Sequence, residues 1–230
     1  MKHGMLTVCF LALLPFAIAA ERRSHPTLVG GVVSYTTEQG TTKALRIGKT
    51  CSDLWVSPDE SVIAFIAIDN AAFGTKSGSA PLITKSSIYV ARRTEGFAPK
   101  RVDVARVVLE GEAWHVLRLP SVSQDGRTLY FFVPVSIKDW TLLSMDLPNG
   151  RPKTIENAIS YCVIWGGEHS GDLLLEKFVY EPRDEGLVVF WRGRAGATNR
   201  LGVPNHTAFQ DLAAQWSTAR GGRCTAPSPR

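Results

Sequence analysis

The sequence predicts an all-β protein with a short C-terminal helix, namely a β-propeller-like array of about four blades that either closes into a ring or stays incomplete as an open arc. Short β-branched and aromatic runs separated by Gly, Pro, Asn and Asp fill most of the chain, which is typical of a sandwich, a barrel or a propeller. Long helical periodicity is nearly absent before residue 206. One motif recurs, and the step to its third copy is about 45 residues, the period of a propeller blade.

The composition is that of an ordinary globular chain. Of 230 residues, 44% are hydrophobic and 20% are charged, so disorder and collagen-like structure are excluded for the bulk of the chain. Lys and Arg number 26 against 21 Asp and Glu, a formal net charge of +5. This mild and scattered excess is far from the concentrated charge of a nucleic-acid-binding protein, so we expect no nucleic-acid partner.

The first 19 residues are typical of a secretory signal peptide. Lys2 precedes an almost unbroken apolar run of 14 residues, Met5 to Ile18, and Ala17 and Ala19 are the small residues expected before a cleavage site. The run is shorter than the ~20 residues of a comfortable bilayer crossing, although an uncleaved N-terminal anchor is the alternative. We therefore expect a periplasmic or secreted protein with no membrane span after cleavage.

Three cysteines remain after such a cleavage: Cys51, Cys162 and Cys224. An exported chain meets an oxidising compartment, so one disulfide with one thiol left over can form, and three pairings are open. A bridge between Cys51 and Cys224 is favoured, because it would staple the tail to the body by closing a loop of about 170 residues. The alternative is three unpaired cysteines. No zinc-site spacing occurs, and we expect no metal or cofactor.

Two segments carry the same turn-and-strand motif. Ser57-Pro58-Asp59 precedes Ile63-Ala64-Phe65, and Ser123-Gln124-Asp125-Gly126 precedes Leu129-Tyr130-Phe131. Short Ser and Asp side chains bond nearby backbone N–H groups, and Gly tolerates the positive φ of a tight hairpin. We therefore interpret Ser57, Asp59, Ser123, Asp125 and Gly126 as turn formers and not as catalytic groups. Glu60 stands in the Gly position of the first copy, so that turn is expected to differ somewhat.

The strands around these turns follow in order. Second strands are expected over residues 63–68 and 128–133, and third strands over 88–92 and 140–146. The first copy has about 12 extra residues near Asn70 to Leu82, which we interpret as a long loop. A weaker third copy places strands over 159–165, 173–179, 186–192 and 197–203, and residues 31–36 and 42–47 look like the last two strands of another unit.

These motifs resemble the WD40-like (PD40) repeat of TolB-type β-propellers, whose blades begin with a pattern close to SPDGxxIAF and continue with an IYV-type strand and a Gly turn. The resemblance covers roughly residues 50–205 and is specific in two copies. The best match is Ser57-Pro58-Asp59 with Ile63-Ala64-Phe65 in the first copy. Gln124 replaces Pro in the second copy, and the third has lost most of the motif. The resemblance implies a periplasmic or secreted propeller and, often, protein binding. It does not imply membership of the Tol system.

The C-terminal segment differs from the repeats. Residues 207–219 place Phe209, Leu212, Ala213 and Trp216 on one helical face, and we expect this helix to cover an edge or an end of the β body. Residues 220–230 are expected to be frayed. The expected organisation is a signal peptide over 1–19, a propeller-like repeat domain over 20–205, and a helix with a flexible tail over 206–230.

No set of side chains in the sequence has the pattern of a catalytic or metal site. No GxSxG occurs, and His169 with its acidic neighbours sits in a predicted turn, where polar residues are expected anyway. The candidate binding surface comprises polar and aromatic residues of expected loops and strand ends: Asn70, Phe73, Lys76, His169 and Arg192.

These observations predict an exported, non-catalytic propeller-like module that binds a protein or an envelope component. An open arc would expose sheet edges, which invite strand addition and self-association. One alternative is a propeller-based hydrolase or lyase acting on glycans or peptides. Another is a structural accessory subunit that is stable only within a complex.

Overall fold

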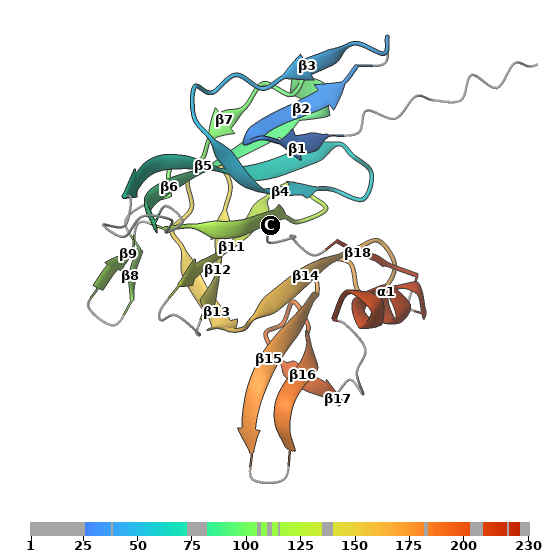
Figure 1. The fold of residues 1–230 in the computed structure, drawn as a ribbon. Helices are drawn as coiled ribbons and strands as arrows, with labels where there is room; N and C mark the ends of the chain where they lie inside the picture. The colour runs from blue at the N-terminus through green and yellow to red at the C-terminus, as the bar shows by residue number, and fades with distance from the viewer. Residues whose placement is uncertain are drawn as a thin grey trace, which may run out of the picture.

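The computed structural model describes residues 26–37, 39–72, 82–104, 107–109, 112–114, 116–134, 140–181, 184–202, 209–219 and 221–225. Four of its antiparallel sheets follow one another as layers along an arc (Figure 1). The arrangement confirms the all-β, propeller-like fold, with one α-helix among the described residues.

Two complete blades form the middle of the arc. The first consists of β4 (Cys51–Val56), β5 (Val62–Ala72), β6 (Leu82–Arg92) and β7 (Lys100–Arg101), paired in that order. The second consists of β10 (Arg118–Val122), β11 (Thr128–Pro134), β12 (Trp140–Asp146) and β13 (Lys153–Asn157). A short hairpin, β8 (Val107–Leu109) with β9 (Glu112–Trp114), stands between them in the chain. The expected long loop is shorter than predicted, because β5 and β6 extend into it; residues 73–81 lie outside the described residues.

A three-stranded sheet precedes the first blade and covers its outer face. It contains β1 (Thr27–Val29), β2 (Val32–Thr36) and β3 (Thr42–Ala44), one strand more than the sequence predicts. Leu28, Val33 and Leu45 from this part of the chain pack with Ile63 and Phe65 of β5. Because alternate side chains of a strand point to opposite faces, β5 uses one face for this contact and the other for the second blade.

The third blade is followed by the C-terminal segment, which returns to it. The blade contains β14 (Ser160–Trp165), β15 (Leu173–Glu181), β16 (Asp184–Arg192) and β17 (Thr198–Gly202). After helix α1 (Phe209–Ala219), strand β18 (Arg223–Thr225) pairs antiparallel with β14. The expectation of a frayed tail is therefore wrong for residues 223–225, which form the fifth strand of this sheet.

The disulfide joins Cys162 of β14 to Cys224 of β18, with 5.7 Å between their Cα atoms. The predicted pairing of Cys224 with Cys51 is wrong, because β18 places Cys224 in the third blade. Cys51 belongs to the first blade and is a buried free thiol, packed against the N-terminal sheet. Burial raises the pKa of this thiol, which lowers the fraction of reactive thiolate.

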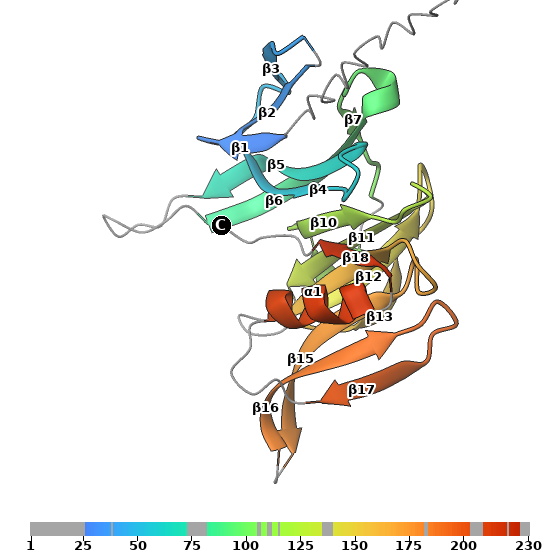
Figure 2. The same cartoon turned by 90° about the vertical axis from the view of Figure 1, so that its right-hand side faces the viewer.

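Helix α1 covers the outer face of the third blade. Phe209 and Ala213 of the helix pack on Cys162, Ile164 and Leu174, while the neighbouring residues of β14 face the second blade. Figure 2 shows α1 beside β18, with the N-terminal sheet at the opposite end of the molecule. Both ends of the arc are thus covered, and in both views they lie far from each other. No helix within the described ranges is long and apolar enough to cross a bilayer.

A bulge in β10 joins the three blades. The pairing register shifts between Arg118 and Ser121, and Leu119 within the bulge has a positive φ of 48°. Its backbone N–H donates to Asp53 Oδ2 of the first blade (3.1 Å), and its carbonyl accepts from the Tyr161 hydroxyl of the third (2.6 Å). A bulge frees backbone groups from the ladder, and here both groups are used to bond adjacent blades.

A buried ion pair reinforces the joint between the first and second blades. Arg118 donates through Nε to Asp53 Oδ2 at 2.5 Å and through Nη2 to Asp53 Oδ1 at 3.2 Å. Asp53 is 2% exposed, and these donors compensate for the solvent that its carboxylate has lost. Trp165 makes a similar link on the other side, where its indole N–H donates to the carbonyl of Val122 at 3.1 Å.

Candidate functional site

The repeated turns gather at one end of the blades. In the first blade, Ser57 Oγ donates to Asp59 Oδ1 (2.6 Å) and accepts from the Val62 N–H (3.0 Å). In the second, Ser123 Oγ donates to Asp125 Oδ1 (2.6 Å) and accepts from the Thr128 N–H (2.9 Å). The two turns are therefore built by the same local network, with each carboxylate held by its own hairpin.

The pKa values of the two carboxyl groups fit this role. Burial alone would raise the pKa of Asp59, but hydrogen bonds from Ser57 and Ser61 outweigh it and lower the pKa. Hydrogen bonds from Ser123 and from the Arg127 N–H lower the pKa of Asp125. A carboxylate that is stabilised as an anion by its own turn is a poor general acid.

The expectation of a different turn in the first copy is wrong. Glu60 has a φ of 57° and donates its N–H to the Ser57 carbonyl at 2.8 Å, as Gly126, with a φ of 70°, does to Ser123 at 2.9 Å. Glu60 thus adopts the left-handed conformation that favours glycine. Gly126 has a further reason to lack a side chain, since a Cβ there would lie 2.5 Å from Nη1 of Arg92.

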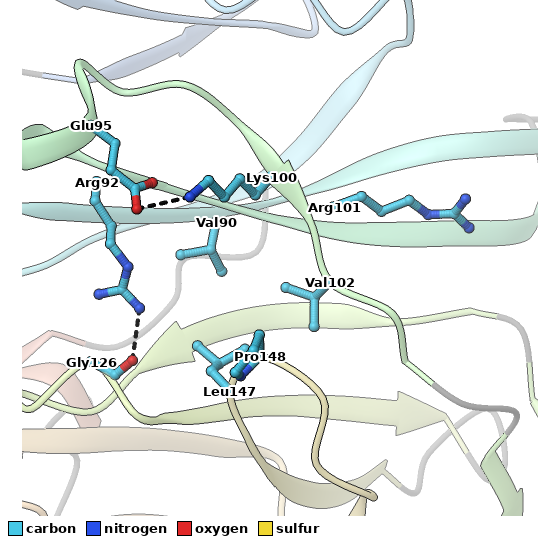
Figure 3. A pocket seen from close by; sticks show the side chains of 9 residues that line it. All are labelled: Val90, Arg92, Glu95, Lys100, Arg101, Val102, Gly126, Leu147 and Pro148. Carbon is cyan, nitrogen blue, oxygen red and sulfur yellow. Dashed lines mark hydrogen bonds and ion pairs between the residues drawn. The ribbon is translucent and has the colours of Figure 1, made fainter.

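A pocket of about 240 Å³ opens between the first and second blades at this end (Figure 3). Four apolar residues contribute to its lining: Val90, Val102, Leu147 and Pro148. Val90 and Val102 are buried in the core shared by the blades, so this side of the pocket is fixed by packing. The β10–β11 turn contributes Gly126.

Charged side chains complete the pocket. Arg92 lies over Gly126 and donates from Nη2 to its carbonyl oxygen at 2.8 Å. Lys100 Nζ lies 2.8 Å from Glu95 Oε1. Arg101 also lines the pocket, but Figure 3 shows its guanidinium directed away from the other charges. Because Arg101 is directed away, Arg92 and Lys100 against Glu95 leave one excess positive charge at the pocket, which suits an anionic group.

A second polar cluster lies where the third blade meets α1. Asp172 is 6% exposed, and both of its carboxylate oxygens have partners. Oδ2 lies 2.9 Å from His169 Nδ1 and accepts from the Trp191 indole N–H at 3.0 Å. Oδ1 accepts from the Arg194 N–H at 3.0 Å. The His169 ring lies 5.1 Å from Trp191 and 5.6 Å from Trp216 of α1, between ring centroids. The cluster therefore docks the helix. Within the described ranges, no three His, Cys, Asp or Glu side chains gather as a metal ion would require.

An apolar patch extends from the third blade beyond α1. Phe178 and Tyr180 of β15 are 40% and 75% exposed, and Leu187 of β16 is 40% exposed. Phe178 lies directly opposite Leu187 in the register, and the Phe178 and Tyr180 ring centroids are 4.6 Å apart. These three residues, the hairpin patch, share the face that α1 covers nearer to β14.

The residues predicted as a binding surface lie in different parts of the structure. His169 and Arg192 lie at the turn end of the third blade, where His169 contacts Asp172 and Arg192 donates to Thr198 Oγ1 at 3.0 Å. Asn70 lies in β5 of the first blade, eight residues beyond the start of that strand at Val62, and Phe73 and Lys76 lie outside the described residues. The turn residues and the candidate pocket instead share the opposite end of that blade.

The sequence did not single out the residues that the structure brings into the pocket and the patch. Arg92 ends the strand expected over residues 88–92, and Lys100 is one of the scattered basic residues. Phe178 and Leu187 fall in the strands expected over 173–179 and 186–192, and Tyr180 follows the first of these. The signal for the patch is the length of the third-blade strands: nine residues each in β15 and β16, against five in β17. The residues of β15 and β16 that extend beyond the end of β17 have no third strand beside them.

No protein-family model and no curated protein sequence matches the chain. Among solved structures, the β-propeller domain of the Trilobed protease from Pyrococcus furiosus, described as having an open velcro topology, is similar over 78% of this chain and 52% of its own, with 13% identity and a TM-score of 0.44. TolB from Acinetobacter baumannii is similar over 77% of this chain and 39% of its own, with 12% identity and a TM-score of 0.45.

A protein of unknown function from Bacteroides thetaiotaomicron is similar over 76% of this chain and 41% of its own, with 10% identity and a TM-score of 0.41. The chain thus spans about half of these structures or less. At such identities these are similarities of fold alone, and they assign no function to the residues of the site.

Proposed function

We propose that the chain is an exported, non-catalytic module that binds a protein or an envelope component through the hairpin patch. The observation that carries this proposal is the exposure of Phe178, Tyr180 and Leu187 as one contiguous surface. Exposed aromatic and aliphatic side chains that touch one another are typical of interaction surfaces, whereas single exposed apolar residues need no explanation.

Export is supported by two independent features. The apolar run Met5 to Ile18 has the length and flanks of a signal peptide. The Cys162–Cys224 disulfide suits an oxidising compartment. A periplasmic or secreted location follows from both, and self-association through the exposed edges of the end sheets would follow from the open arc.

The alternative of a hydrolase or lyase would rest on the His169–Asp172 pair, which resembles a base and its orienting carboxylate. Asp172 is already occupied by the Trp191 and Arg194 donors, and His169 lies against the Trp191 and Trp216 rings. This packing gives the pair a structural role, and we do not propose an enzymatic function.

A comparative pull-down from envelope extract tests the proposal. The bait is the wild-type chain, the double variant Phe178→Ser/Tyr180→Ser, or the matched control Val29→Ser, which replaces a 73% exposed residue at the other end of the arc. We expect the wild type and the control to recover the same amount of the same component. The double variant should recover at least about tenfold less of it, as when an aromatic anchor is removed. Equal recovery by all three would contradict the proposal, and light scattering of each bait would report whether it self-associates.

A further inference from the structure

We propose that the pocket between the first and second blades binds a carboxylate that is carried on a compact apolar group, with Arg92 as the partner of the carboxylate. This goes beyond the proposed function, because the pocket lies between β6, β7 and the β10–β11 turn, and the hairpin patch lies in the third blade.

Arg92 has donors left for a ligand. A guanidinium carries five N–H donors in a planar fork, and the one side-chain hydrogen bond that Arg92 makes among the described residues is the 2.8 Å bond to the Gly126 carbonyl. That bond holds the guanidinium at the pocket (Figure 3). A positioned guanidinium of this kind binds a carboxylate by two parallel hydrogen bonds.

The charge of the lining favours a single negative charge. Arg92 and Lys100 against Glu95 leave one excess positive charge, so an anion is attracted. Glu95 lies at the same rim, paired with Lys100 at 2.8 Å, and would repel a second negative charge on the ligand. A carboxylate therefore fits better than a doubly charged phosphate.

The size and the apolar side of the pocket define the rest of the ligand. Its volume of about 240 Å³ is below the usual range for sites that take drug-sized molecules. Val90, Val102 and Leu147 provide a surface for a short branched chain. A branched short-chain fatty acid and the C-terminal residue of a polypeptide share this chemistry, namely a carboxylate next to a small aliphatic group.

The first experiment compares acid with amide. Isovalerate and isovaleramide are titrated into the isotopically labelled full chain at low salt, and the backbone amide resonances of Gly126 and Glu95 are followed. We expect the acid to shift both resonances, with binding in the millimolar range, and the amide to bind about tenfold more weakly or not at all, because a charged hydrogen bond is lost. Equal binding of acid and amide, or shifts confined to other regions, would overturn the proposal.

A second pair of probes distinguishes the two sources. The acetylated tripeptide Ala-Ala-Val with a free carboxylate is compared with the same peptide amidated at its C-terminus. Stronger binding of the free tripeptide than of isovalerate identifies the end of a polypeptide as the ligand, and stronger binding of isovalerate identifies a free acid. Both results support a carboxylate site, whereas binding of the amidated peptide with the affinity of the free one contradicts it.

Variants assign the site to its residues. Arg92→Gln is expected to weaken isovalerate binding at least about tenfold, whereas the matched control Arg127→Gln, which removes an exposed positive charge next to Gly126, changes it less than about twofold. Glu95→Gln is expected to tighten binding about two- to threefold by removing a like charge. If Arg92→Gln does not fold, Lys100→Gln serves in its place, with an expected weakening of about two- to threefold. Unchanged isovalerate affinity in Arg92→Gln would overturn the assignment. If Lys100→Gln has to be used instead, unchanged affinity in that variant would do the same.

Discussion

The two ends of the arc are covered by different means. At the N-terminal end, β1, β2 and β3 lie on the first blade through apolar side chains, and the Tyr35 hydroxyl donates to the carbonyl of Gly96 at 3.1 Å. At the C-terminal end, α1 and β18 lie on the third blade and are held by a disulfide, the buried carboxylate of Asp172 and the aromatic rings around it.

The difference follows from what each element can bury. The N-terminal part of the chain buries Leu28, Val33 and Leu45 against the first blade, so this cover rests mainly on apolar contact. Helix α1 has 11 residues, which is too short to be stable alone and presents only a narrow apolar stripe. A cover of this kind requires covalent and polar anchors, and substituting each anchor measures how much it contributes to stability.

The largest expected effect is that of the disulfide. The double variant Cys162→Ala/Cys224→Ala should lower the free energy of unfolding by about 4 kcal/mol, the loop-entropy value for a separation of 62 residues. Cys51→Ala, which removes the buried thiol at the N-terminal end, should cost about 1 kcal/mol. Urea denaturation of the three proteins gives both values. Equal losses at the two ends would show that the bridge contributes nothing beyond side-chain packing.

The buried carboxylate is expected to rank second. Asp172→Asn should destabilise the protein by about 2–3 kcal/mol, because an amide cannot accept from His169, Trp191 and the Arg194 N–H as the carboxylate does. Tyr35→Phe, its counterpart at the other end, should cost about 1 kcal/mol or less, since that hydrogen bond is exposed. The midpoints of thermal unfolding would rank the two variants, and a larger loss in Tyr35→Phe would reverse the comparison.

The smallest effect concerns Glu176, on the face of the third blade between α1 and the hairpin patch. Burial raises the pKa of this carboxyl group. Its charged form is therefore disfavoured in the folded state, and the wild type loses stability as the pH rises above the unfolded value of about 4.3. Glu176→Gln should stabilise the protein at pH 7 by less than about 0.5 kcal/mol and have no effect at pH 3. Glu95→Gln, at an exposed ion pair, is the control, and a pH-independent effect of Glu176→Gln would contradict the assignment.

Local signals in the sequence were sufficient for the repeated turns and the helix. Ser57 and Asp59 act within their own hairpin, so residue type and spacing contain the necessary information. The helix over Phe209–Ala219 confirms the predicted periodicity for the same reason. The conformation of Glu60 was not predictable in this way, because the surrounding hairpin imposes a backbone that its side chain does not favour.

Features that depend on distant parts of the chain were not predictable. Strand β18 has only three residues, too few to show the polar–apolar alternation of a strand. Its pairing with β14 determines which cysteine bonds to Cys224. The Asp53–Arg118 pair and the Arg92–Gly126 contact join residues 65 and 34 positions apart, in different blades. In the sequence these residues are scattered charges, and only the stacking of the blades brings them to the joint and to the pocket.

The distance between the two ends of the arc decides whether the sheets form an open arc or a closed ring. Spin labels at Val29→Cys and Tyr180→Cys, both at exposed positions, can be placed specifically because Cys51 is buried and the other two described cysteines are bridged. Double electron–electron resonance on the diluted monomer should give a distance several times the ~10 Å between packed sheets. A distance close to that spacing would mean that the end sheets meet in a closed ring, and it would contradict the open arc.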